Sequence, residues 1–421
     1  MSFDTISVIG LGYIGLPTAA MFASKGKNVI GVDINQETIE IINAGKIHII
    51  EPNLDVMVDK AVSQGFLKAV SSPEPADAFL ISVPTPFLNL NANEIPKPDL
   101  GYIESAAKAL APVLKKGDLV VLESTSPVGA TEQMATWLSD IRADLTFPHT
   151  SGDSSDIRIA YCPERVLPGQ VVKELVQNDR IIGGISQACS QAAVKLYETF
   201  TEGACVITNA RTAEMAKLTE NASRDVSIAF ANELSIVCDK LNIDIWELIG
   251  LANRHPRVNI LNPGPGVGGH CIAVDPWFIV SDAPDESILI QAARRVNDGK
   301  PGWVVDKIES VLNEIRSLPS DYERTKINVA FYGLAFKADI DDLRESPSVE
   351  IVKSFAATPD IDISVIEPNI DKLPDELHFC SLMSINEAIE KADVHVMLVN
   401  HKAFYKMKPI NGLIIDTQGI W

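Results

Sequence analysis

Cys271 is the residue whose setting most clearly indicates chemistry. It follows the glycine-rich run Gly264-Pro-Gly266-Val-Gly268-Gly269-His270, and Asp275 comes four residues later. Glycines lack a Cβ, so the backbone of such a loop can approach a ligand closely. Most cysteines are inert core residues, and we interpret Cys189, Cys205, Cys238 and Cys380 in that way, with Cys162 left open. The loop therefore predicts a nucleophilic thiol at Cys271.

A second group of candidates lies on one predicted helix, Arg211–Lys240. Lys217, Asn221 and Arg224 are separated by steps of four and three residues, which places them on one helix face. A lysine and an amide can stabilise an oxyanion, and an arginine one turn further can hold a phosphate or a sugar hydroxyl. A solvated helix face would show the same spacing, so the pattern alone leaves both interpretations open.

Two further segments bring basic groups together. They are Arg254-His255-Pro256-Arg257 and the stretch from Lys337 to Arg344, and each would supply the cations that an anionic substrate requires. Each alone is more typical of ordinary surface charge. Because no third ligand stands at a recognised spacing from His255 and His270, we expect no metal site.

The candidates must be positioned by regular elements, and the chain predicts them in three stretches. The first third alternates β-branched runs with helical patterns, which indicates a parallel sheet with right-handed crossovers. The expected strands are Thr5–Ile9, Asn28–Val32, Ala78–Val83, Leu119–Glu123 and Arg158–Tyr161, and the helices include Leu16–Lys25 and Gln36–Ala44.

A helical middle follows, and strand–helix alternation then resumes. Helices are expected over Arg211–Lys240 and within Asp285–Ser317, with an irregular loop between them whose length indicates a functional role. The later strands are Ile327–Tyr332, Ile363–Ile366, Val394–Val399 and Leu413–Asp416, with helices at Ser348–Ala356 and Ile385–Lys391. We predict an α/β protein with two Rossmann-like, doubly wound parallel-sheet domains, 1–207 and 317–421, joined by a helical domain, 208–316.

The first predicted strand leads into a dinucleotide fingerprint, Gly10-Leu-Gly12-Tyr-Ile-Gly15. Its glycines are suited to a tight turn, close approach of a pyrophosphate and close helix–strand packing, and the helix N-terminus favours anions. Asp33 ends the second strand, where an acid binds the ribose diol and repels a 2′-phosphate. The pattern predicts NAD rather than NADP. Thr85 and Thr125 follow later strands and should lie at the same edge of the sheet.

Composition excludes several classes of protein. The chain has 421 residues and a formal net charge of −20, which argues against a nucleic-acid partner, since phosphate contacts need a basic face. Six cysteines without CxxC spacing favour a reducing compartment. No apolar run approaches the roughly 18 residues of a membrane span, and the N-terminus resembles a strand rather than a signal peptide. We therefore expect a cytoplasmic protein without a membrane partner.

Seven motifs, in order, resemble those of the UDP-glucose/GDP-mannose dehydrogenase family: GLGYIGLP, VPTP, ESTSPVG, CPERVLPG, AEMAKLTEN, GPGVGGHCIAVDP and GLAFKADIDDLRESP. The similarity covers essentially the whole chain and is more specific than the fingerprint. NRHPRVN and GGHCIAVDPWF resemble the branch that oxidises UDP-N-acetylmannosamine. The UDP-glucose branch has a Ser before the cysteine and Pro-Lys-Asp after it, whereas this chain has His270 and Ala273-Val274-Asp275.

The resemblance implies a homodimer and a four-electron oxidation of the sugar C6 alcohol that consumes two NAD. It implies that Cys271 adds to the aldehyde, forms a thiohemiacetal and then a thioester, and releases the uronate by hydrolysis, a covalent route that divides one difficult step into easier ones. The branch also implies that the product enters a surface polysaccharide, such as a capsule or an enterobacterial common antigen.

The resemblance also assigns residue roles. Lys217 would be the acid/base or oxyanion partner and Asn221 an oxyanion donor, Asp275 and Thr125 would position water, and Glu164 would assist thioester hydrolysis. Contacts to the sugar nucleotide are implied for Arg165, Val166, Lys217, Asn221, Arg224, His255, Arg257, Gly268 and Lys337. Contacts to NAD are implied for Gly10, Gly12, Tyr13, Ile14, Gly15, Asp33, Thr85, Thr125 and Arg344.

Three other functions stay open on sequence grounds. The same chemistry would serve UDP-N-acetylglucosamine or UDP-glucose. A two-electron alcohol dehydrogenase would stop at the aldehyde. A non-catalytic sugar-nucleotide sensor would use the same scaffold, but it would have no need of Lys217, Asn221, Cys271 and Asp275 together.

Overall fold

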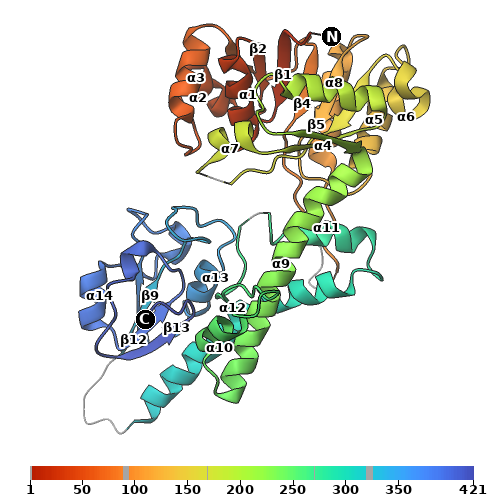
Figure 1. The fold of residues 1–421 in the computed structure, drawn as a ribbon. Coiled ribbons are helices and arrows are strands. Elements are labelled where there is room, and N and C mark those ends of the chain that lie inside the picture. Colours follow the sequence, from red (N-terminus) through yellow and green to blue (C-terminus); the bar gives the residue numbers. More distant parts are fainter. Residues whose placement is uncertain (1, 89–93, 168, 270, 319–325) are drawn as a thin grey trace. The chain divides into compact units, whose positions relative to one another are not determined.

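The computed structural model describes residues 2–88, 94–167, 169–269, 271–318 and 326–421. The chain divides into two compact units (Figure 1), an N-terminal unit of residues 1–220 with 281–283, and a C-terminal unit of residues 221–280 with 284–421. Each unit is built on one β-sheet. Because the helical middle is shared between the two units, the predicted boundaries at 207/208 and 316/317 stay predictions.

The sheet of the N-terminal unit has the strand order β3-β2-β1-β4-β5-β6-β7-β8. Its strands are β1 Thr5–Ile9, β2 Asn28–Val32, β3 Leu67–Val70, β4 Ala78–Ile81, β5 Leu119–Leu122, β6 Arg158–Tyr161, β7 Arg180–Gly184 and β8 Cys205–Asn209. β1 pairs in parallel with both β2 and β4, so the order of the strands reverses at the β1–β4 pair. Ligands of open α/β sheets bind at the carboxyl ends of the strands at such a reversal.

Helices cover both faces of this sheet. They are α1 Gly15–Ser24, α2 Gln36–Asn43, α3 Leu54–Ser63, α4 Gly101–Leu110, α5 Ala130–Ile141, α6 Pro148–Ser151, α7 Val171–Gln177 and α8 Gln187–Tyr197. One apolar core contains residues of α1, α2, α3, α7 and α8, and the other contains residues of α4 and α5. The central strands β4 and β5 are continuously apolar and buried throughout, as strands with both faces covered require.

One strand pair departs from the expected parallel arrangement, because β6 pairs with β7 in the antiparallel direction. The connecting helix α7 has only seven residues and does not return the chain to the opposite end of the sheet. β7 then pairs in parallel with β8 at the edge. The strands β3, β7 and β8 were not expected from the sequence.

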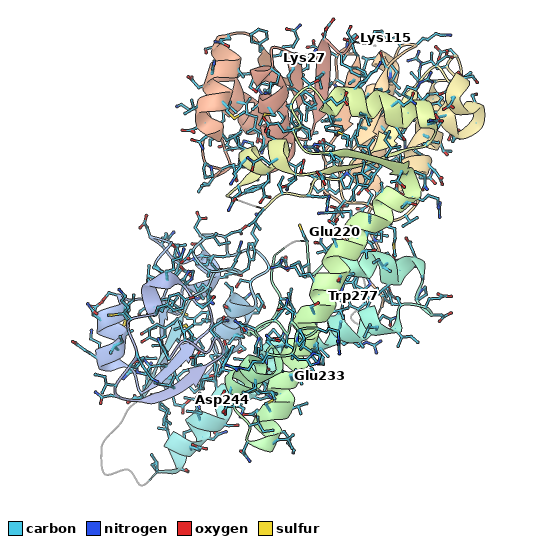
Figure 2. The ribbon with its side chains drawn as sticks, viewed as in Figure 1. Lys27, Lys115, Glu220, Glu233, Asp244 and Trp277 are labelled. Carbon is cyan, nitrogen blue, oxygen red and sulfur yellow. The ribbon has the colours of Figure 1, made fainter. Side chains whose placement is uncertain are left out.

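The middle of the chain is helical. α9 spans Ala210–Leu241, a run of 32 residues that includes both Glu220 and Glu233 (Figure 2). It is followed by α10 Ile245–Ala252, α11 Asp275–Asp282 and α12 Ile288–Ser317. The described residues between α10 and α11 form no helix or strand, in agreement with the irregular loop that the glycines and prolines predict. The sequence did not predict α10.

The C-terminal unit contains a second sheet with the strand order β11-β10-β9-β12-β13, and all its pairs are parallel. Its elements are β9 Ile327–Tyr332, α13 Pro347–Ser354, β10 Ile361–Ile366, β11 Ser381–Leu382, α14 Ile385–Lys391, β12 Val394–Met397 and β13 Leu413–Asp416. Residues of α12 and α13 form one core with the sheet, and Ala388 of α14 belongs to another. The expected class, two Rossmann-like sheets with a helical middle, is confirmed.

Candidate active site

The turn after β1 needs glycine at two positions for steric reasons. Gly10 has φ +91°, and a Cβ there would lie 2.5 Å from the carbonyl oxygen of Ser82. A Cβ on Gly15 would lie 1.8 Å from the carbonyl oxygen of Gly10, whereas a Cβ on Gly12 would meet nothing within 4 Å. The first and third glycines therefore permit close packing, and the second borders open space in which a pyrophosphate fits.

Asp33 follows β2 and ties this turn to the neighbouring strand. Its Oδ2 accepts a hydrogen bond from the backbone N–H of Leu11 at 2.9 Å, and its Oδ1 accepts one from that of Asn35 at 2.9 Å. The side chain is half-buried, and carboxylate oxygens have further lone pairs for a ribose diol. Among the described residues, no side chain caps the first turn of α1, so its positive end is available to an anion. The residues present fit a dinucleotide.

The loops after β4 and β5 form one structure. The Thr85 hydroxyl donates to the carbonyl oxygen of Thr125 at 2.7 Å, and the Ser124 hydroxyl donates to that of Val83 at 2.7 Å. Glu214 of α9 caps the helix that follows the second loop, because its carboxylate accepts from the backbone N–H of Gly129 at 2.6 Å. The structure thus brings Thr85 and Thr125 together.

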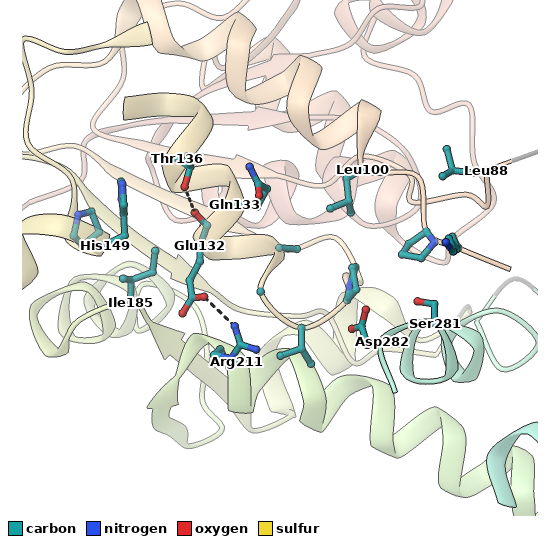
Figure 3. A pocket seen from close by; sticks show the side chains of 17 residues that line it. Leu88, Leu100, Glu132, Gln133, Thr136, His149, Ile185, Arg211, Ser281 and Asp282 are labelled. Carbon is teal, nitrogen blue, oxygen red and sulfur yellow. Dashed lines mark hydrogen bonds and ion pairs between the residues drawn. The ribbon is translucent and has the colours of Figure 1, made fainter. Parts of the chain in front are cut away.

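A hollow of about 940 Å³ adjoins this second loop within the N-terminal unit (Figure 3). Its lining includes Val128, His149 and an ion pair of 3.0 Å between Glu132 and Arg211. Pro127, Val128 and Gly129 of the ESTSPVG motif line it, but none of the residues to which a catalytic or binding role was assigned is among its described lining residues. Glu132 and Arg211 already pair with each other, and we assign no ligand to this hollow.

Two predicted residues after β6 are held by partners of opposite charge. Glu164 is buried, with its Oε2 3.2 Å from a guanidinium nitrogen of Arg180. Arg165 pairs with Glu220 of α9 at 2.6 Å. The pairing of Arg165 places its guanidinium against a carboxylate of its own unit, and Val166 packs against the core.

Cys162 and Glu123 lie in the same buried region. Burial raises the pKa of the Cys162 thiol to about 12, so this cysteine, left open by the sequence, is an unreactive core residue. Burial likewise raises the pKa of Glu123 to about 7, against hydrogen bonds from Ser82 and Tyr197 that lower it. Glu123 stands two residues before Thr125, yet the sequence did not indicate that its carboxyl group is buried.

The cysteine loop of the C-terminal unit is anchored to α9 at both ends. The backbone N–H of Gly264 donates to Oδ1 of Asn232 at 2.9 Å, and Nδ2 of Asn221 donates to Oδ2 of Asp275 at 2.5 Å. The backbone N–H of Asp275 donates to the carbonyl oxygen of Cys271 at 2.9 Å, and Cys271 itself is exposed. An accessible thiol on a loop fixed at two points can serve as a nucleophile.

The glycines of this loop have a packing role that we did not expect. A Cβ on Gly268 would lie 2.7 Å from the carbonyl oxygen of Glu345 and 2.8 Å from the Phe336 side chain. A Cβ on Gly266 would lie 2.8 Å from Pro347. The expected reason was close approach of a ligand, whereas here the glycines let the cysteine loop pack against the segment that contains Lys337 and Arg344.

A buried polar network supports the anchor at Asn232. Nδ2 of Asn232 donates to Oδ1 of Asn297 at 2.9 Å, and Nδ2 of Asn297 donates to Asp225 at 2.8 Å. Arg294 pairs with the same Asp225 carboxylate at 2.5 Å. Burial raises the pKa of Asp225, while the charge of Arg294 lowers it. This network was not predictable from local patterns, because its members come from two helices far apart in the chain.

The turn after β9 repeats the construction of the turn after β1. Gly333 has φ +91°, and the backbone N–H of Leu334 donates to Oε2 of Glu367 at 2.8 Å. Nε2 of His401 lies 3.0 Å from the same oxygen. Burial acts to raise the pKa of Glu367, but the hydrogen bonds from His401 and the backbone outweigh it and lower that pKa. Lys337, three residues after Leu334, is exposed.

Four further predicted residues lie at the surface of the part that the structure describes, whereas Lys217 and Ile14 are half-buried. Arg224, His255 and Arg257 are exposed. Arg344 is exposed too, pairs with Asp342 at 2.6 Å, and borders a hollow of about 400 Å³ that Val267 also lines. His270 lies outside the described residues, and within them no three His, Cys, Asp or Glu side chains are grouped as metal ligands.

A complete dinucleotide turn on one sheet, a second nucleotide-type turn on another and an exposed cysteine on an anchored loop define a nucleotide-dependent oxidoreductase. Three family models match the chain: "UDP-glucose/GDP-mannose dehydrogenase family, NAD binding domain" at residues 4–201, the central domain of that family at 211–299 and its UDP binding domain at 330–421. The chain belongs to the UDP-glucose/GDP-mannose dehydrogenase family. The expected family and its NAD cofactor are confirmed.

Similar proteins agree with this assignment over the full length. The chain is 59% identical to a UDP-N-acetyl-D-mannosamine dehydrogenase of Yersinia pestis, with 100% of both chains covered. It is 58% identical to an NDP-N-acetyl-D-galactosaminuronic acid dehydrogenase of Ralstonia solanacearum, covering 100% of this chain and 97% of the relative. A solved structure of a UDP-D-ManNAc dehydrogenase from Pyrococcus horikoshii is 38% identical, with a TM-score of 0.85 over 99% of this chain and 96% of that one.

Among the described residues, no helix is both long and apolar enough to cross a lipid bilayer.

Proposed function

We propose that this chain oxidises the C6 alcohol of UDP-N-acetyl-D-mannosamine to the corresponding uronate, in two successive NAD-dependent steps. The observation that carries the proposal is the 59% identity to the Yersinia pestis enzyme over both complete chains. The anchored, exposed Cys271 supports it, because a two-electron dehydrogenase has no need of a thiol that can bind the aldehyde.

NAD supplies the hydride acceptor for both oxidations. Its proposed contacts come from the turn after β1 with Gly10, Gly12, Tyr13, Ile14 and Gly15, and from Asp33, Thr85, Thr125 and Arg344. The Asp33 carboxylate would accept hydrogen bonds from the ribose diol and repel a 2′-phosphate. The proposed contacts to the sugar nucleotide are Arg165, Val166, Lys217, Asn221, Arg224, His255, Arg257, Gly268 and Lys337.

The residue roles follow from chemistry and from the family motifs. The Cys271 thiolate adds to the aldehyde and later leaves from the thioester. Lys217 moves the proton of the alcohol and, as a cation, favours the thiolate. Asn221 donates to the developing oxyanion, and its bond of 2.5 Å to Asp275 fixes the orientation of its amide. Asp275, Thr125 and Glu164 direct the water that hydrolyses the thioester.

The proposal extends to the setting of the reaction. We propose a cytoplasmic homodimer, with the domain roles NAD binding for 1–207, dimer formation and catalysis for 208–316 and UDP-sugar binding for 317–421. Apolar side chains at Phe230, Val237 and Leu241 of α9 are each more than two-fifths exposed, which supports a partner surface on this helix. The uronate would enter a surface polysaccharide.

A second sugar is favoured by one specific observation. The Ralstonia solanacearum relative is 58% identical over its nearly complete length and is named for N-acetyl-D-galactosaminuronic acid. The two candidate substrates differ in the stereochemistry of the sugar ring and share the C6 alcohol, so the same cysteine chemistry serves both. Only contacts to the ring would separate them.

The test is the amount of NADH formed per mole of limiting UDP-sugar, with mass analysis of the product. We expect two NADH and a uronate from UDP-N-acetylmannosamine, and a lower kcat/KM for UDP-N-acetylgalactosamine, UDP-N-acetylglucosamine and UDP-glucose. One NADH and an aldehyde would remove the thioester from the mechanism. A higher kcat/KM for UDP-N-acetylgalactosamine would replace the first sugar by the second.

A further inference from the structure

Glu164 adjoins a buried cluster of charged and aromatic side chains to which the proposed mechanism assigns no role. Arg180 of β7 is 4% exposed, and the Glu164 side chain with which it pairs is 7% exposed. The other carboxylate oxygen of Glu164 accepts the backbone N–H of Arg165 at 2.7 Å. Both oxygens of the carboxylate are therefore held, one by the backbone and one by a guanidinium.

Arg180 is itself fixed on several sides. Its Nε donates to the Thr201 hydroxyl at 3.0 Å, and an Nη donates to the carbonyl oxygen of Leu175 at 3.3 Å. Its guanidinium stacks on the ring of Tyr197 at 4.5 Å and lies 5.1 Å from the ring of Phe200. A planar group that stacks and donates in a fixed fork has these contacts available, whereas a lysine ammonium does not.

A second buried carboxyl group, that of Glu123, has hydrogen-bond partners other than Arg180. Glu123 accepts the Tyr197 hydroxyl at 2.6 Å on one oxygen and the Ser82 hydroxyl at 2.6 Å on the other. Tyr197 thus contacts Glu123 through its hydroxyl and Arg180 through its ring. Arg180 therefore forms its ion pair with Glu164 rather than with Glu123.

A buried ion pair is weak support for stability, because the desolvation of two charges offsets most of their attraction. An apolar pair of similar volume would fill the same space at no greater cost. The fixed geometry of Arg180 therefore suggests a task in which the position of the Glu164 carboxylate matters.

We propose that Arg180 is a positioning residue for thioester hydrolysis, holding the Glu164 carboxylate in the one orientation from which it directs water. This inference rests on the proposed function, in which Glu164 assists hydrolysis of the thioester on Cys271. In that step the water oxygen bonds to the acyl carbon and the carbon–sulfur bond breaks. Glu164 takes a proton from the water and passes it to the leaving thiolate, and the carboxylic acid product releases its own proton to solvent.

Replacing Arg180, which holds the Glu164 carboxylate, should slow hydrolysis of the thioester and leave the two oxidations intact. In Arg180→Gln and Arg180→Lys we expect a rapid burst of two NADH per active site, followed by steady-state turnover about 10²-fold slower than in the wild type. Acid quenching during turnover should trap the sugar-nucleotide acyl group on the peptide that contains Cys271, detected by mass spectrometry. A role in folding alone would lower the burst amplitude or the melting temperature and trap no adduct.

Three further variants make the result specific. Glu164→Gln should trap the same adduct, and Cys271→Ser should trap none. Arg142→Gln is the matched control, because Arg142 lies in the same unit, pairs with Asp144 at 2.7 Å and donates to the carbonyl oxygens of Ala111 and Leu114. It should show neither a burst nor an adduct.

The outcomes separate the inference from the proposed function. Adduct in Glu164→Gln together with normal turnover in both Arg180 variants would overturn the inference alone. Absence of adduct in Glu164→Gln would remove the hydrolytic role of Glu164, and the inference with it. Should Arg180→Gln fail to fold, Arg180→Lys, which keeps the buried charge, decides the case: adduct supports the inference and wild-type turnover refutes it.

Discussion

At the scale of single residues, Asp33 combines a structural contact with a proposed cofactor contact. Its carboxylate receives backbone N–H groups of Leu11 and Asn35 at 2.9 Å, and it follows the strand where a dinucleotide ribose is expected. The two tasks require different properties. An acceptor oxygen suffices for the turn, whereas discrimination against a 2′-phosphate requires negative charge.

Substitution can separate these tasks. Asp33→Ala should weaken the binding of NAD by roughly 10- to 100-fold, since hydrogen bonds to a charged group contribute about 1.5–3 kcal/mol. It should also reduce the preference for NAD over NADP. Asp33→Asn keeps an acceptor for Leu11 and removes the charge, so it should raise the relative affinity for NADP with a smaller loss of NAD. Titration of both cofactors by fluorescence measures this. Unchanged affinities in Asp33→Ala would exclude Asp33 from the ribose site.

Glu123 predicts a pH dependence of stability. Its folded pKa of about 7 lies above the ordinary value of 4.5, so the neutral carboxyl group is favoured in the folded chain. The shifted pKa of Glu123 contributes roughly 3 kcal/mol to the free energy of unfolding. This contribution is fully present below about pH 4.5 and is lost as the pH rises through about 7.

Glu123→Gln mimics the neutral form and should lack this loss. Between pH 5 and pH 9, the melting temperature of the wild type should fall relative to that of Glu123→Gln, as measured by calorimetry at several pH values. Glu74→Gln removes an exposed carboxylate that pairs with Lys68 at the surface and should follow the wild type. Parallel pH profiles for the wild type and Glu123→Gln would show that the Glu123 carboxyl does not titrate near neutral pH.

At the scale of elements, the same type of turn follows the first strand of each sheet. In each sheet a glycine with φ +91° follows the first strand, and the next residue is a leucine whose N–H binds a carboxylate at the end of the second strand. Asp33 is half-buried, whereas Glu367 is 4% exposed and also contacts His401. Glu367 is therefore buried among partners within the protein and is not accessible to a ribose. This agrees with a UDP binding domain rather than a second NAD site.

Loosening the second turn should affect one ligand only. In Glu367→Gln one carboxylate oxygen becomes an NH2 group, so the side chain cannot accept from Leu334 at one end and from Asn369 at the other, as the carboxylate does. The segment leading to Lys337 should therefore become less ordered. We expect the KM for the UDP-sugar to rise about 10-fold, equivalent to 1.4 kcal/mol, while the KM for NAD is unchanged. Steady-state kinetics with each substrate varied in turn measures both constants.

The control for this prediction is Asp362→Asn on β10, the strand that ends just before Glu367. The Asp362 carboxylate pairs with Lys326 at the surface. It should leave both constants as they are, because exposed ion pairs contribute little. Equal increases in both KM values in Glu367→Gln would indicate a general loss of folding rather than a local effect on the second turn.

Sequence patterns predicted the elements whose signal is local. The apolar runs of β1, β4 and β5, the fingerprint glycines and the irregular cysteine loop each depend on neighbouring residues, and each was found. The buried partners were not predictable in this way, because Glu123 meets Ser82 and Tyr197 at separations of 41 and 74 residues. Strand β7 was missed for a related reason, since its two terminal glycines weaken the strand pattern and its packing comes from other elements.

At the scale of the whole molecule, the charge balance opposes the proposed ligands. The chain carries a formal net charge of −20, and both NAD and a UDP-sugar are anionic. Binding must therefore depend on local groups rather than on the overall field. In the proposed site, the first turn of α1 and the cations Lys217, Arg257 and Lys337 would provide such groups.

The proposed dimer gives the last prediction. Phe230, Val237 and Leu241 of α9 are separated by seven and four residues, so they share one helix face, and they are 52%, 44% and 60% exposed. A row of apolar side chains exposed on one helix is typical of an interface. Val237→Asp places a charge at the centre of this row and should convert the dimer to a monomer in light scattering coupled to gel filtration. Ile410→Asp, at a site 92% exposed outside the helix, should stay dimeric. A monomeric wild type, or a dimeric Val237→Asp, would show that this face of α9 does not hold two chains together.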